Sequence, residues 1–125
     1  MNEGTDILRS LHAIIDAFNA HDIDRVMSFF ADDCVLEMPR GPDPCGLRAV
    51  GLGAVRDALL SRFHGIPDVH YGDAEHFVSG NTGISQWTIS GTTTTGQRIE
   101  VCGCDFYTFA AGKIVKKDSF WKIRE

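Results

Sequence analysis

Residues 99–114, Ile-Glu-Val-Cys-Gly-Cys-Asp-Phe-Tyr-Thr-Phe-Ala-Ala-Gly-Lys-Ile, decide the fold. The alternation predicts a strand over 99–109, and the glycine-containing segment 110–113 predicts a tight turn into a last strand over 114–123. Successive strand residues point to opposite faces, so Asp105 shares a face with Val101 and Tyr107. A charged residue among apolar neighbours is unusual, and Asp105 is therefore a candidate functional carboxyl.

The remaining segments predict helices first and strands afterwards. Apolar residues recur at helical spacing over 5–20, 23–30 and 52–64, and the proline- and glycine-rich stretch 39–50 predicts a long loop that borders a functional opening. Further strands are expected over 34–38, 69–79 and 84–94. This order predicts an α+β fold, with three N-terminal helices packed on a mainly antiparallel sheet, as a single domain over 1–125.

Composition excludes two classes of partner. The 125 residues carry 17 acidic and 12 basic side chains, a formal charge of −5, which disfavours binding to nucleic acid. No apolar stretch is long enough to span a membrane. The basic residues cluster near the C-terminus, and we interpret this cluster as the solvated edge of a strand. Its members are Lys113, Lys116, Lys117, Lys122 and Arg124.

The cysteine pattern favours a reducing compartment. Cys34, Cys45, Cys102 and Cys104 form no CxxC pair and have no histidine at zinc spacing. No secretory leader is recognised, so we expect free buried thiols in a cytoplasmic protein. No phosphate-binding glycine loop is visible either, and neither a metal nor a cofactor is expected.

Seven short motifs, spread over nearly the whole chain, occur together in order. They are Phe18-Asn-Ala-His-Asp22, Phe30-Ala-Asp-Asp33, Pro39 with Gly41, Gly53-Ala-Val-Arg56, Trp87-Thr-Ile-Ser-Gly-Thr92, Gly103-Cys-Asp-Phe-Tyr-Thr-Phe109 and Gly112-Lys-Ile114. This set resembles the NTF2-like superfamily, in its SnoaL-like and ketosteroid-isomerase-like branch. The resemblance implies a strongly curved sheet around a conical cavity, and a homodimer through the outer sheet face.

The catalytic residues of that superfamily are only partly matched. By resemblance to ketosteroid isomerase, Asp105 would be the oxyanion donor, but the base position holds Met38 and the tyrosine position holds Ile14. A standard ketosteroid isomerase is therefore not expected. Limonene-type epoxide hydrolases need Asp and Arg on a strand that here has the sequence Ser85-Gln-Trp-Thr88. The SnoaL-like cyclases need one acid on the sheet, which Asp105 matches.

The expected pocket has a predominantly apolar wall. Besides Asp105, its predicted substrate-binding residues are Ile14, Phe18, Met38, Val55, Leu59, Phe63, Gln86, Thr88, Tyr107, Ser119 and Trp121. His70 is a weak candidate for a catalytic base, because imidazole titrates near neutrality.

The inward face of strand 84–94 is open to two interpretations. Periodicity alone would turn Trp87 inward. The resemblance favours the opposite: Gln86 and Thr88 would line the cavity, while Trp87 and Ile89 would join a dimer face with the outward residues Cys102, Cys104 and Phe106.

The function predicted from the sequence is that of a small-molecule pocket protein. We expect an isomerase, cyclase or lyase acting on a hydrophobic carbonyl compound, with Asp105 as acid or oxyanion donor. The alternative is a non-catalytic binding module with an eroded active site, which the Met38 and Ile14 positions favour. A protein-docking domain is a third possibility that rests on the fold alone.

Overall fold

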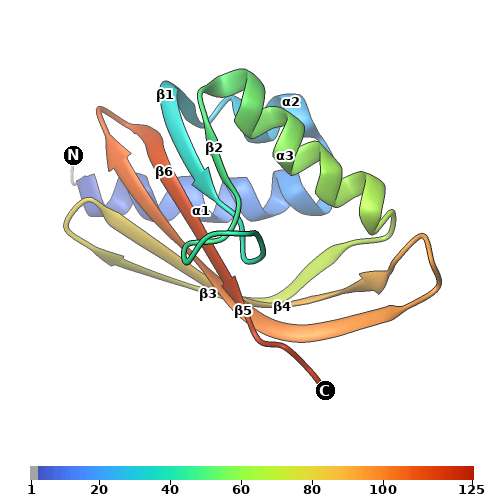
Figure 1. Cartoon of the computed structure of the whole chain (residues 1–125). Helices are drawn as coiled ribbons and strands as arrows, with labels where there is room; N and C mark the ends of the chain where they lie inside the picture. The colour runs from blue at the N-terminus through green and yellow to red at the C-terminus, as the bar shows by residue number, and fades with distance from the viewer. Residues whose placement is uncertain (1–2) are drawn as a thin grey trace.

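The computed structural model describes residues 3–125 as six strands and three helices in one curled sheet-and-helix unit (Figure 1). The helices are α1 (Glu3–Asn19), α2 (Ile23–Met27) and α3 (Leu52–Gly65). The strands are β1 (Phe30–Glu37), β2 (Arg48–Val50), β3 (His70–Ser79), β4 (Thr82–Thr92), β5 (Arg98–Ala110) and β6 (Lys113–Trp121). The α+β prediction is confirmed: α1, α3 and β3 to β6 begin and end within two residues of their predicted bounds, whereas β1 begins four residues before its predicted start.

The sheet has the order β2-β1-β6-β5-β4-β3, and only the β1–β6 pair is parallel. Its concave side holds α1 and α3, as Figure 1 shows. Helix α1 packs on β3 and β4, and α3 packs on β1 and β2. The core lies between these layers because α1 and α3 each turn an apolar stripe toward the sheet, including Leu11, Ile14, Val55 and Leu59.

Three expectations need correction. The second helix ends at Met27 instead of 30, because the chain from Phe30 onward is already paired in β1. The C-terminal basic cluster is not a strand edge: β6 lies between β1 and β5, and Lys117 is buried. The four cysteines are free but not all buried, since Cys45 and Cys102 are exposed.

No helix within residues 3–125 is long and apolar enough to cross a membrane.

Candidate functional site

Asp105 lies in the middle of β5 with its side chain on the concave face of the sheet, and it is 3% exposed. Four donors surround its carboxyl group. Oδ1 accepts from Lys117 Nζ at 2.9 Å and from Ser119 Oγ at 2.5 Å. Oδ2 accepts from Trp87 Nε1 at 3.0 Å and, over a longer 3.5 Å, from the hydroxyl of Tyr107. Because all four partners donate, both oxygens of the Asp105 carboxyl group act as hydrogen-bond acceptors.

Strand alternation brings the cation to the acid. Ser119 of β6 is paired with Asp105, and Lys117 is paired with Tyr107, so both β6 side chains point to the same face as the carboxyl group. The Lys117 ammonium also donates to Ser119 Oγ at 2.7 Å, which closes a triangle of three polar side chains. The rings of Phe18 and Tyr107 lie near the ammonium, with centroids 5.5 and 5.8 Å from Nζ. The ion pair is thus sealed by aromatic side chains, with 7% and 5% of the two side chains exposed.

Gly103, on the same strand as Asp105, leaves room for the Trp87 indole that donates a hydrogen bond to Asp105. Trp87 of β4 is paired with Gly103 of β5. A Cβ atom at Gly103 would lie 2.6 Å from the Trp87 ring and 2.5 Å from the Phe120 carbonyl oxygen. Any larger residue would therefore displace the ring that donates to Asp105.

The ion pair borders a small inner cavity. The space that a water-sized sphere can occupy there is about 20 Å³, room for a single water molecule. Among its lining residues, the Arg62 guanidinium lies 4.3 Å from the centre of the Trp121 ring. The full lining is Met38, Pro39, Leu59, Arg62, Tyr71, Trp87, Asp105, Lys117, Ser119 and Trp121.

Two buried phenols near Asp105, those of Tyr71 and Tyr107, are neutral. Burial raises the pKa of Tyr71 far above its usual value; the Arg62 guanidinium opposes this shift, and the charge of Asp105 adds to it. Burial and Asp105 likewise raise the pKa of Tyr107. Both hydroxyl groups therefore remain protonated donors at any physiological pH.

Comparison with known proteins then identifies the family. The model of the SnoaL-like domain matches residues 11–117 of this chain. The chain belongs to the SnoaL-like family. No curated protein sequence matches it closely enough to extend that assignment.

Solved structures show the same fold at low sequence identity. A provisionally assigned polyketide cyclase from Xanthomonas campestris pv. campestris is 19% identical, with a TM-score of 0.86 over 97% of this chain and 93% of its own. An NTF2-like protein of unknown function from Mesorhizobium loti is 24% identical, with a TM-score of 0.79 over 98% and 96% of the two chains. TerC, co-crystallised with polyporic acid, is 15% identical, with a TM-score of 0.78 over 94% and 92%. The NTF2-like cone expected from the sequence is confirmed.

Some of the predicted site residues line the inner cavity. Met38, Leu59, Asp105, Ser119 and Trp121 line it. Other predicted lining residues belong to the surrounding core and do not line the cavity: Ile14, Phe18, Val55, Phe63 and Tyr107.

The resemblance-based orientation of β4 is wrong. Gln86 is exposed on the convex face, where it is paired with Cys104, and Thr88 lies opposite Cys102 there. Trp87 and Ile89 are buried on the concave side. The pairing of β4 with β5 is continuous from 82 to 92, and without a bulge the simple alternation decides the face. His70, the weak candidate base, is exposed at the start of β3 and is not among the residues that line the cavity.

Sequence reasoning missed Lys117, Trp87, Tyr71 and Arg62 as site residues. A signal for Lys117 was present, because it has the same strand parity as Ser119 and Trp121, which were both placed in the pocket. Within residues 3–125 no group of histidine, cysteine and acidic side chains could hold a metal ion. The cations Arg62 and Lys117 suit an anionic oxygen of a ligand instead.

Replacing the buried lysine is expected to cost much stability. Lys117→Met leaves Asp105 buried without its cation, so the free energy of unfolding should fall by about 3–5 kcal/mol. Adding Asp105→Asn to that variant should restore part of the loss, because no unpaired charge then remains. Urea unfolding of the single and double variants measures both effects.

The matched control is Lys122→Met, which removes an exposed lysine from the same basic cluster. It should change stability by less than about 0.5 kcal/mol. Equal stability of the Lys117→Met and Lys122→Met proteins would contradict the buried ion pair.

Proposed function

We propose that this chain is an enzyme that moves a proton on a hydrophobic carbonyl compound, as an isomerase, cyclase or lyase. The observation that carries the proposal is the buried Asp105–Lys117 pair beside a cavity. In such a water-poor site, a fixed charge stabilises a developing oxyanion more strongly than it does in water. A pocket whose only task was to bind an apolar molecule would not require two buried charges.

The hydrogen-bond geometry suggests how the two charges divide the work. Two N–H bonds of the Lys117 ammonium go to Asp105 and Ser119, and its third has no hydrogen-bond partner among residues 3–125. That third N–H is available to a substrate carbonyl oxygen. Asp105 would accept the proton that leaves the neighbouring carbon, and would return it at another position or after a new C–C bond has formed. This assigns the electrophilic role to Lys117 and differs from the sequence-based expectation, in which Asp105 itself was the acid or oxyanion donor.

The relatives support a carbonyl substrate by analogy. One structural relative carries a provisional polyketide cyclase assignment, and another was crystallised with polyporic acid. Cyclisation of an activated, already acidic substrate tolerates a sparse site, because the substrate supplies much of the driving force. Similarity of fold favours reactions on carbonyl compounds over other classes, but it does not identify the reaction.

The second candidate function is a non-catalytic binding module. The specific observation in its favour is that apolar Met38 and Ile14 occupy two of the expected catalytic positions. The inner cavity, about 20 Å³, is far below the usual volume of a ligand site, so either candidate function requires side chains to move when a ligand enters.

Proton exchange separates the two candidates. We expect the protein to accelerate deuterium incorporation from D₂O at the benzylic α-carbon of a ketone fused to an aromatic ring, such as 2-tetralone, followed by NMR. Asp105→Asn should reduce this acceleration by about 10²–10⁴-fold, because it removes the positioned base. Lys117→Met should also abolish it, and Lys113→Met, at an exposed lysine that lines neither pocket, should retain it. Binding of the ketone without any exchange would support the binding module and contradict the enzyme.

We further propose a homodimer through the convex sheet face. Phe77, Phe106 and Phe120 are 49%, 40% and 52% exposed there, on β3, β5 and β6. The Phe106 and Phe120 rings meet edge to face at 5.8 Å. Exposed aromatic residues on neighbouring strands form an apolar patch that a second copy would cover. Trp87 and Ile89, which the family resemblance placed in this interface, are excluded by their burial on the other face.

Sedimentation tests the dimer. The wild-type protein should sediment as a dimer at about 100 μM, and Phe106→Lys should make it monomeric because a charge would be buried in the interface. Leu47→Lys, at an exposed apolar residue in the loop before β2, is the control and should remain dimeric. A wild-type monomer at that concentration would rule this interface out.

A further inference from the structure

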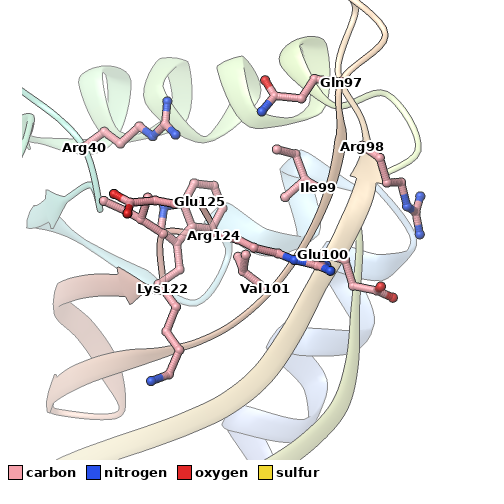
Figure 2. A pocket seen from close by; sticks show the side chains of 11 residues that line it. Arg40, Gln97, Arg98, Ile99, Glu100, Val101, Lys122, Arg124 and Glu125 are labelled. Carbon is pink, nitrogen blue, oxygen red and sulfur yellow. The ribbon is translucent and has the colours of Figure 1, made fainter.

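A second, larger pocket lies directly outside the inner cavity. Its volume is about 450 Å³, within the range of small-molecule sites. It is formed by the first part of β5, the segment after β6 and one residue of the loop after β1. Figure 2 shows the lining: Arg40, Gln97, Arg98, Ile99, Glu100, Val101, Trp121, Lys122, Ile123, Arg124 and Glu125.

Trp121 belongs to the lining of both spaces. It is the last residue of β6, and its half-buried ring rests against the Arg62 guanidinium. The outer pocket and the cavity of Asp105 and Lys117 therefore share a wall that includes this indole ring. If the indole moved aside, a planar ligand ring could take its place against Arg62 with the same cation–π contact.

The outer pocket combines a cationic rim with an apolar floor. In Figure 2, Arg40 and Arg124 extend over the hollow, whereas Arg98, Lys122 and the Glu100 carboxylate point away from it. Ile99, Val101 and Trp121 supply apolar surface to the same lining. Guanidinium groups match carboxylates in geometry and charge, so Arg40 and Arg124 suit the carboxylate of a ligand.

We propose that the outer pocket binds the anionic end of a planar aromatic acid, and that Trp121 is the partition that moves to admit the aromatic ring toward Lys117. Glu125 also lines the pocket, so the anion would bind on the Arg40 and Arg124 side. This inference rests on the proposed function in that it names the substrate class of the same site. It concerns binding alone and requires no turnover.

The charge requirement is tested with 2-naphthoate as probe and its neutral methyl ester as comparison, by calorimetric titration. The carboxylate should bind at least about tenfold more tightly than the ester, as expected for one charge-assisted contact. The double variant Arg40→Gln/Arg124→Gln should remove that preference. Arg9→Gln, which alters an exposed arginine of α1 outside this pocket, should keep it. Equal binding of acid and ester, no binding of naphthoate, or an unchanged preference in the double variant would overturn the proposal.

The proposed movement of Trp121 is tested with the same ligand, 2-naphthoate, in a titration followed by NMR. The chain has two tryptophans, so ¹⁵N-indole labelling gives two resonances, which Trp121→Phe assigns. Naphthoate should shift both the Trp121 and the Trp87 signals, because the ring would pass Trp121 and approach Trp87. A shift of Trp121 alone would show that the ligand stays outside and would overturn the partition.

The two proposals can fail separately. Charge-selective naphthoate binding with no ketone exchange would contradict the enzyme and leave the outer pocket in place. Ketone exchange that depends on Asp105, without charge-selective naphthoate binding, would do the reverse.

Discussion

The ion pair between Asp105 and Lys117 places two charges in the interior of a small protein, where each loses several kcal/mol of hydration. Only close pairing and additional hydrogen bonds offset that loss, so the surrounding structure is constrained. Ser119 must point inward from β6, Trp87 must point inward from β4, and the β4–β5–β6 register must hold all of them within reach. Gly103 is part of the same constraint, because a side chain there would displace the indole.

This constraint also explains the division of the cone into two spaces. The inner cavity is small, and three donors to Asp105, namely Trp87, Lys117 and Ser119, lie in its lining. In our proposal, selection of a ligand by size and charge belongs to the outer pocket, which has the volume and the arginines for it. In this account the sheet positions the Asp105 and Lys117 side chains. Access of a ligand to them depends on side chains at the end of the sheet and on the loop after β1.

Much of the fold is encoded locally and could be predicted from the sequence. The stripes on α1 and α3, the turn at 110–113 and the long strands follow from spacing and turn residues. The parallel pairing of β1 with β6 joins segments about eighty positions apart, so no local sequence pattern predicts it. That pairing makes β6 an inner strand, which is why the C-terminal lysines were misinterpreted as a solvated edge.

The acid of the site was predicted from the sequence, whereas its cation was overlooked although strand parity pointed to it. Asp105 stands out as a charged residue on an apolar face, and alternation alone orients Trp87 correctly. Lys117 was overlooked because lysine is almost always exposed, and its burial depends on an acid twelve residues away on another strand. Tyr71 and Arg62 reach the cavity only through the packing of α3 and β3 around it, which three-dimensional structure alone reveals.

The most direct test of the central claim is the environment of the Lys117 ammonium group, observed by NMR in ¹⁵N-lysine-labelled protein. A buried, hydrogen-bonded ammonium exchanges its protons slowly with water, so it should give a resolved N–H signal at neutral pH while the exposed lysines do not. The account predicts this signal, with Overhauser contacts to the rings of Phe18 and Tyr107 and its loss in Lys117→Met. A Lys117 resonance that exchanges as rapidly as that of Lys122, without contacts to either ring, would contradict the account.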